Sequence, residues 1–326
     1  MATETSCGAH RVSGNIVIAD ESALFFHLHT AENTAMGTPI REFTLAEGYA
    51  GSSEELSRFN TQHPLFGGEP VSVLVPERRL RMCVGGIDAK LCTLQLPMNS
   101  VMRLRDGLYI ASPELTFLRL ANGRSEASTA EIGMNLCARY YLNASSDNIE
   151  DRPDFLTTPD ELQSFLEEAD GARGCRKAKL ALRWVLPNSG SPMETKMAVL
   201  FRLPLGKGGF ALPFDAMNYD VRTGRHTRVS GQSWYCIDMV SKKYQVGMEY
   251  DGLDYHLDKM LDIRRRNALL SIGWEIFPLG KDVLFDADAT EKLGYQVAKR
   301  MGIRIQKPKS WESKYAKLRN DLGLPS

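Results

Sequence analysis

The chain lacks the features that mark membrane, secreted and redox proteins. Within its 326 residues, no run approaches the roughly 20 apolar residues that cross a bilayer. The segment from Met1 to Val12 has no basic stretch followed by an apolar core, so we expect no signal peptide. The six cysteines are scattered, and none form a Cys-x-x-Cys pair that would support a zinc site or a redox motif. We therefore expect a cytoplasmic protein with buried thiols and no membrane partner.

Several common enzyme motifs are also missing. The sequence has no Gly-x-x-x-x-Gly-Lys-[Ser/Thr] phosphate loop, no Gly-x-Ser-x-Gly nucleophile motif and no His-Glu-x-x-His zinc motif. The glycine-rich stretch from Gly206 to Gly209 follows no strand pattern, so we interpret it as a flexible loop. His27 and His29 have a His-x-His spacing but no third metal ligand nearby. These templates therefore fit the chain poorly.

The formal net charge of zero hides an opposite charge balance in the two halves. Residues 1–170 carry 13 Lys and Arg against 24 Asp and Glu, a net charge of −11. Residues 171–326 carry 27 against 16, a net charge of +11. A basic half is suited to phosphate, and an acidic half is suited to shielding it or to a protein partner. Two solvated surfaces without partners would give the same counts, so both interpretations stay open.

Hydrophobic periodicity predicts an α+β chain in four segments. Residues 1–142 are expected to form a small mixed α+β regulatory or interaction domain, residues 143–190 a linker and helices, residues 191–305 a second domain, and residues 306–326 a basic tail. The linker is the polar stretch from Asn143 to Pro159. The first segment is expected to contain strands at Asn15–Ala19, Val71–Val75 and Leu91–Leu96, a hairpin over Leu104–Ile110, and helices after Ser112 and over Glu131–Tyr141.

Two helices are expected between the linker and the second domain. Thr158 and Pro159 are typical of a helix start, and a second helix is expected over Arg173–Leu186. One face of the second helix is basic, and three of its residues are candidate nucleic-acid contacts. These are Arg173, Arg176 and Lys177. A solvated helix surface would explain the same pattern.

An acidic cluster is predicted on two neighbouring strands of the basic half. Residues 233–240 and 245–252 both alternate as strands do, with a short polar turn between them. If that turn covers Lys242 to Gln245, Asp238 lies opposite Glu249, and Asp251 shares the face of Glu249. Three carboxylates so close raise one another's pKa values, and Mg²⁺ (or Mn²⁺) would relieve the repulsion. We therefore predict that these three side chains bind metal, although an exposed acidic sheet edge is the alternative.

The flanking segments supply further candidates. Ser191 to Glu194 reads as a capping box at a helix start, which gives Glu194 a structural explanation beside a catalytic one. After the second strand, a helix carries Arg264, Arg265 and Arg266, which we expect to steady phosphate charge. A strand over 274–277 and a helix over 289–301 follow. The expected order is helix, strand, strand, helix, strand, helix.

The run Glu249-Tyr250-Asp251-Gly252-x-x-x-His256, followed by Asp262-x-x-Arg265-x-x-x-Leu269-x-x-x-Gly273-Trp274, resembles the very-short-patch-repair-like branch of the PD-(D/E)xK nucleases. The resemblance covers roughly the last third of the chain. It implies a restriction-endonuclease-like αβββαβ core within residues 191–305 that hydrolyses DNA with Mg²⁺. It also implies roles for single residues: acidic catalytic groups at Glu194, Asp238, Glu249 and Asp251, proton transfer by His256, and contact of Arg265 with the acidic centre or the scissile phosphate.

One position departs from that family's pattern and keeps other functions open. The family's lysine, two residues after the glutamate, is replaced by Asp251. Either His256 takes over activation of water, or the domain binds nucleic acid without cutting it. The alternative explanation of His256 is a turn residue that caps the next helix. The three hypotheses are thus a Mg²⁺-dependent endonuclease, a non-catalytic DNA-binding regulator or antitoxin, and a protein-interaction module that acts through the acidic half.

The acidic half carries a second, weaker resemblance. The run Leu104-x-x-Gly107-Leu108-x-x-Ala111-Ser112-Pro113-Glu114 is similar to abortive-infection antitoxin-type regulators that carry a fused nuclease-like domain. This resemblance implies a phage-defence or toxin–antitoxin setting. It implies no particular catalytic residue.

Overall fold

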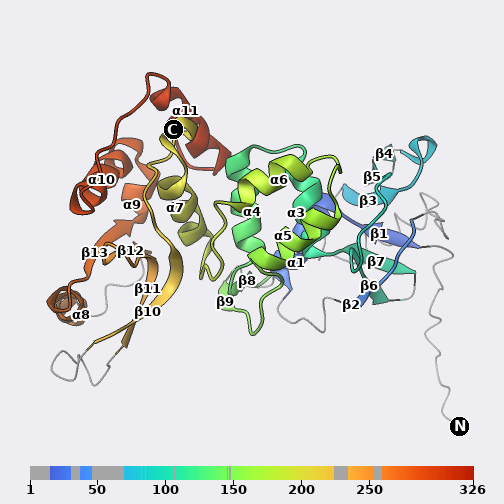
Figure 1. Cartoon of the computed structure of the whole chain (residues 1–326). Helices are drawn as coiled ribbons and strands as arrows, with labels where there is room; N and C mark the ends of the chain where they lie inside the picture. The colour runs from blue at the N-terminus through green and yellow to red at the C-terminus, as the bar shows by residue number, and fades with distance from the viewer. Residues whose placement is uncertain are drawn as a thin grey trace, which may run out of the picture.

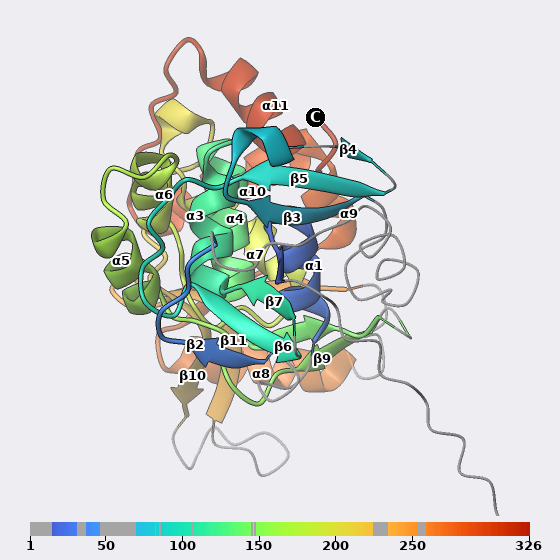
Figure 2. The same cartoon turned by 90° about the vertical axis from the view of Figure 1, so that its right-hand side faces the viewer.

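The computed structural model describes residues 15–30, 37–45, 70–81, 83–84, 86–105, 107–144, 146, 148–223, 234–252 and 259–326. These residues form a mixed α+β structure with two main sheets and a layer of helices between them. The sheet from the first part of the chain lies at one end in Figure 1, and the sheet from the last third lies at the other. Figure 2 looks along this stack, with the first sheet in front. In the described part of the chain, no helix has both the length and the apolar character of a membrane span.

The N-terminal sheet has seven strands in the order β2-β6-β7-β1-β3-β5-β4. The strands β1 and β3 and the β6–β7 hairpin confirm the sequence prediction. The predicted strand over Leu91–Leu96 is wrong, because β5 pairs in parallel with β3 and ends at Leu91, opposite the last residue of β3. The strands are β1 (Ile16–Ile18), β2 (Thr38–Ile40), β3 (Val71–Val75), β4 (Cys83–Val84), β5 (Ile87–Leu91), β6 (Val101–Arg105) and β7 (Leu108–Ala111).

Three helices of the central layer, α3, α4 and α5, start at serine or threonine caps. Ser112 accepts a hydrogen bond from the Leu115 amide at 3.2 Å and begins the predicted helix α3. The predicted helix over Glu131–Tyr141 is shifted, because Ser125 caps α4 earlier in the chain. Thr158 caps α5 with a reciprocal capping box. The helices are α1 (Asp20–His29), α3 (Pro113–Ala121), α4 (Glu126–Leu136), α5 (Pro159–Glu168) and α6 (Cys175–Leu182).

The stretch expected to be a linker is folded against the rest of the molecule. Strand β9 (Ile149–Asp151) pairs with β8 (Tyr140–Leu142) as a hairpin. The next residue, Arg152, is buried and donates hydrogen bonds to the carbonyl oxygens of Thr30 and His27 at 2.7 and 2.8 Å. The polar composition of this stretch suggested a solvated linker. Its arginine is instead buried, where it donates hydrogen bonds to the carbonyl oxygens at the end of α1. One apolar core runs from β1 through the central helices to the C-terminal residues.

The C-terminal sheet has the strand order β10-β11-β12-β13. Strands β10, β11 and β12 are successively antiparallel, and β13 runs parallel to β12. Helix α7 packs on β11 and β12, and α8 packs on β13. The elements are α7 (Pro192–Arg202), β10 (Ala216–Arg222), β11 (Trp234–Ser241), β12 (Val246–Asp251), α8 (Lys259–Ser271), β13 (Glu275–Gly280), α9 (Lys281–Phe285) and α10 (Ala287–Arg300).

Two parts of this region differ from the sequence prediction. Strand β10 was missed, although Met217, Tyr219 and Val221 alternate with polar residues. The segment 306–326, expected to be a basic tail, contains helix α11 (Trp311–Asp321). Trp311 and Arg319 of this helix are buried, and Arg319 donates to the Leu284 carbonyl oxygen at 2.9 Å. A high count of lysine and arginine therefore did not mean a solvated tail.

Candidate functional site

The site is built around the point where β11 and β12 stop pairing. The two strands pair at Ser241–Val246, Val240–Gly247 and Met239–Met248. This confirms the register predicted from the turn. At the next step, where Asp238 would face Glu249, the backbone amide of Tyr250 instead donates to Asp238 Oδ2 at 2.8 Å. The Asp238 carboxyl group thus substitutes for a backbone partner.

The backbone is distorted on the other side of Asp238 as well. Strands β10 and β11 pair at Met217–Met239 and at Tyr219–Ile237, and Asn218 between these pairs has a φ of +43°. Ile237 packs in the apolar cluster that includes Trp274, whereas Met239 packs in the main core. Residues two apart in a regular strand share a face, so the alternation is interrupted at Asp238. Strained backbone of this kind is concentrated at functional sites.

Glu194, near the start of α7, is held by this distorted region. Ser191 accepts a hydrogen bond from the Glu194 amide at 3.2 Å, as expected for the cap. The Glu194 carboxylate does not return to the Ser191 amide, so the predicted reciprocal box is wrong. Its Oε2 atom accepts hydrogen bonds from the Gly190 amide at 2.8 Å and from Asn218 Nδ2 at 2.7 Å. Burial raises the pKa of Glu194 despite these donors.

Asp238 has the most perturbed carboxyl group of the site. Burial, followed by the negative charge of Glu194 and a smaller contribution from Glu249, raises its pKa to about 8. The Tyr250 amide and the positive charge of Arg265 act in the opposite direction. In the metal-free protein, this carboxyl group is therefore mostly protonated at neutral pH. A partly buried carboxyl group with such a shift, beside other acids, is typical of a functional site.

Glu249 forms an ion pair with Arg265 of helix α8. Arg265 donates to the two carboxylate oxygens of Glu249 at 2.5 and 3.2 Å. It also donates to the Cys236 carbonyl oxygen at 2.6 Å, and its guanidinium group lies 5.7 Å from the centre of the Tyr235 ring. The resemblance implies contact between Arg265 and the acidic centre, and that contact is present. Its role in binding phosphate stays a prediction.

The structure does not gather the three predicted metal ligands. Asp251 is exposed at the end of β12, where it pairs with Gly280 of β13. Among the residues that the structure describes, no group of three or more His, Cys, Asp and Glu is placed to hold a metal ion. His256 lies outside the described residues. The prediction of Asp238, Glu249 and Asp251 as a joint metal site is therefore not matched by their arrangement here, and metal binding stays a prediction.

The predicted nucleic-acid contacts differ in how much they are used within the fold. Arg173 donates to Asn122 Oδ1 at 3.1 Å, and Lys177 donates to the Asn122 carbonyl oxygen at 3.5 Å. Both side chains therefore hold the loop between α3 and α4. Arg176 is exposed beside a cavity of about 500 Å³. The other two predicted contacts, Arg264 and Arg266, are exposed on α8.

Sequence reasoning missed Asn218 and Cys236. Asn218, in β10, donates a hydrogen bond to Glu194 and so links helix α7 to this strand. The Cys236 thiol lies 3.6 Å from Asn218 Oδ1. Burial, together with the negative charges of Asp220, Asp238 and Glu194, raises the pKa of this thiol to about 11, so it is not a reactive thiolate. An asparagine inside an alternating strand pattern was the available signal, because asparagine tolerates positive φ.

Comparisons with known proteins give no family for this chain. No protein-family model, no curated protein and no solved structure matches it. The function is therefore argued from the site alone.

Proposed function

We propose that α7, β10–β13 and α8 form a restriction-endonuclease-like αβββαβ core that hydrolyses DNA phosphodiester bonds with Mg²⁺ or Mn²⁺. The order of the elements supports this proposal: a helix, three antiparallel strands, a second helix, and a fourth strand parallel to the third. The observation that carries it is Asp238, a partly buried carboxyl group whose pKa is raised to about 8 by burial and by the charges of Glu194 and Glu249. Its burial beside two other acids is costly for a fold that uses it only for packing.

The residues present fit a hard divalent cation. Glu194, Asp238 and Glu249 offer only oxygen donors, which Mg²⁺ and Mn²⁺ prefer. Mg²⁺ is commonly held by one or two carboxylates, with substrate phosphate and water as its other ligands. Burial, then the charge of Glu194 and, to a smaller extent, that of Glu249 raise the pKa of Asp238, and a cation held by these carboxylates would offset the repulsion between them. Asp251, at the exposed end of β12, remains a candidate for a further ligand.

The chain's own residues would position the phosphate. A bound Mg²⁺ would polarise the phosphate and lower the pKa of a bound water. Hydrogen bonds to Glu249 and to the Cys236 carbonyl oxygen hold the Arg265 side chain in one position. Binding of a phosphate oxygen to its guanidinium group would therefore lose little conformational entropy. The Tyr250 amide fixes one oxygen of Asp238. His256 is the candidate for proton transfer, since its ordinary pKa is near 6.5.

Cleavage of plasmid and single-stranded DNA tests the proposal directly. The wild type is expected to cut at least one of these two DNA substrates with Mg²⁺ or Mn²⁺, and to cut neither in EDTA. Asp238→Asn is expected to lower the rate by roughly 100-fold or more, since it removes a charged group at the reacting centre. Asp220→Asn is the matched control, because Asp220 is exposed on the neighbouring strand β10. A wild type that cuts no DNA with any metal would refute catalysis.

A second candidate is a DNA-binding regulator or antitoxin with a degenerate nuclease core. Two observations favour it: Asp251 stands where the family has lysine, and Arg265 already neutralises Glu249. This function predicts DNA affinity that falls steeply with salt and is the same with and without EDTA. It also predicts that Asp238→Asn binds DNA as the wild type does. Gel-shift and cleavage assays on the same samples separate the two functions, and either would suit a phage-defence or toxin–antitoxin setting.

A further inference from the structure

Helix α8 carries large apolar side chains on the face that points away from its sheet. Leu269 packs inward, in the apolar cluster beneath the helix. Ile263 and Leu270, two turns apart, share the outer face and are 51% and 57% exposed. Arg264 and Arg266, both exposed, flank these two residues. A surface helix is normally polar on its outer face, so this face has the character of a contact surface.

DNA binding alone does not account for this surface. Arg264 and Arg266 suit phosphate, but phosphate contacts gain nothing from exposed isoleucine and leucine side chains. A protein partner accounts for both kinds of residue. Apolar side chains bury area at the centre of such interfaces, and arginine is enriched there.

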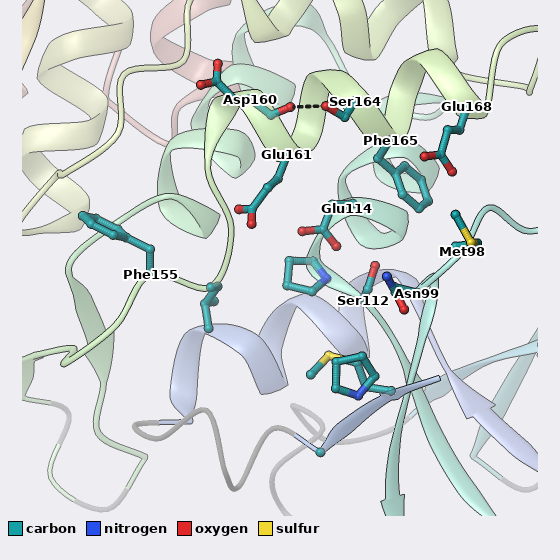
Figure 3. A pocket seen from close by; sticks show the side chains of 15 residues that line it. Met98, Asn99, Ser112, Glu114, Phe155, Asp160, Glu161, Ser164, Phe165 and Glu168 are labelled. Carbon is teal, nitrogen blue, oxygen red and sulfur yellow. Dashed lines mark hydrogen bonds between the residues drawn. The ribbon is translucent and has the colours of Figure 1, made fainter. Parts of the chain in front are cut away.

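A cavity of complementary character lies between α3, α5 and the strands β2 and β6. Its volume is about 630 Å³, within the range of ligand pockets. The carboxyl groups of Glu114 and Glu161 point into it in Figure 3, and Glu168 lies at its side. Its described lining residues include four acids but no lysine or arginine. Met98 and Phe155 of the lining are 49% and 42% exposed. The cavity thus offers negative charge with apolar contacts.

We infer that the outer face of α8 in one copy of the chain docks at this acidic cavity in a second copy. Two exposed arginines beside apolar side chains meet four carboxyl groups beside exposed Met98 and Phe155. Opposite potentials of this kind steer association and fix its orientation. The cavity lies in the half of the chain with a net negative charge, and α8 lies in the half with a net positive charge, so the overall charges favour the same contact.

The geometry excludes this contact within one chain. Figure 1 shows α8 at one end of the molecule, with α7 and α4 between it and the helices α3 and α5 that line the cavity. Since two different surfaces meet, the association is head-to-tail and forms a ring or an open chain of copies. It does not depend on nuclease activity.

Light scattering of the full chain over a range of concentrations tests this proposal. The mass is expected to rise above the 36.4 kDa of a monomer as concentration increases. It is expected to fall back in 1 M salt, where charges are screened within about 3 Å. Reversal of α8 (Arg264→Glu with Arg266→Glu) and reversal of the cavity (Asp160→Lys with Glu168→Lys) should each weaken association about tenfold or more. These choices avoid Glu161, which caps α5, and the partly buried Glu114.

Mixing the two reversed variants gives the sharpest result. Each variant alone opposes like charges, but the mixture pairs an acidic cavity with a basic α8 and a basic cavity with an acidic α8, so association is expected to return. Lys292→Glu with Lys299→Glu, on the exposed side of α10, is the matched control and should associate as the wild type does. Circular dichroism establishes that each variant is folded. A wild type that stays monomeric, a mixture that does not recover, or a cavity reversal without effect would each overturn the proposal.

Discussion

Two aspartates, the buried Asp20 beside the first sheet and the partly buried Asp238 in the second, have opposite electrostatic surroundings. Asp20 follows β1 and accepts two hydrogen bonds from Arg119, at 2.6 and 3.0 Å, although its φ of +52° is strained. Asp238 interrupts β11, and its hydrogen bond comes from a neutral amide while two other acids lie near it. The charge of Asp20 is balanced within the fold. That of Asp238 is not, and this difference separates a structural acid from a candidate functional one.

The first prediction concerns the balanced acid and has the largest effect on stability. Asp20→Asn leaves Arg119 buried without its counter-charge, so the free energy of unfolding should fall by about 3–5 kcal/mol. Replacing both partners, Asp20→Asn with Arg119→Met, should recover most of that loss. Urea denaturation of the two single variants and the double variant gives the coupling free energy. A coupling near zero would contradict the structural role given to the pair.

The same substitution at the unbalanced acid should have the opposite sign. Asp238 has a folded pKa of about 8, above its ordinary value of 3.8. The contribution of this carboxyl group to the stability of the fold is therefore fully present below pH 4, and it is lost as the pH rises through about 8. At pH 7 and in EDTA, Asp238→Asn should therefore raise the free energy of unfolding, by up to about 4 kcal/mol. The measurement is urea denaturation at pH 7 and at pH 4, where the gain should disappear; a loss of stability at pH 7 would assign Asp238 a structural role.

The contrast between the two acids could be predicted only in part from the sequence. Local signals gave the caps at Ser112, Thr158 and Ser191, and the turn at Lys242 gave the register of β11 and β12. These features depend on residues near one another in the chain. The α+β class followed from the same periodicities.

Long-range features could not be predicted in this way. The partner of Asp20 lies 99 residues away, and the contact of Arg152 with Thr30 spans 122. The break in alternation at Asp238 depends on Asn218, in a strand that the sequence prediction missed. The register predicted from the turn placed Asp238 opposite Glu249. It could not show that the Asp238 side chain, and not a backbone carbonyl of β11, accepts the hydrogen bond from the Tyr250 amide. At Asn218, a position that the local rules missed also has a positive φ, whereas the contact of Arg152 with Thr30 was missed because it spans the chain.

A third prediction extends the comparison to a buried base. His27 is fully buried, and burial lowers its pKa from 6.5 to about 4, with a further contribution from the positive charge of Arg152. Its neutral form is therefore favoured in the folded state. The resulting stability is present above pH 6.5 and is lost as pH falls through about 4, which amounts to about 3 kcal/mol. Denaturation between pH 7 and pH 4 should show a smaller loss for His27→Gln than for the wild type; equal losses would mean that His27 does not titrate in this range.

The smallest expected effect comes from two serine caps with the same geometry in the two regions. Ser112 and Ser191 each accept a hydrogen bond from a helix amide at 3.2 Å, so replacing either with alanine should cost about 1 kcal/mol of unfolding free energy. Only Ser191 bonds the amide of Glu194, whose carboxylate reaches Asn218 opposite Asp238. If the proposed nuclease site is correct, Ser191→Ala should lower the cleavage rate at a temperature where both variants are folded, and Ser112→Ala should not. Equal rates for the two variants would mean that the Ser191 cap contributes only to stability and does not position Glu194 for the reaction, which would contradict the role proposed for Glu194.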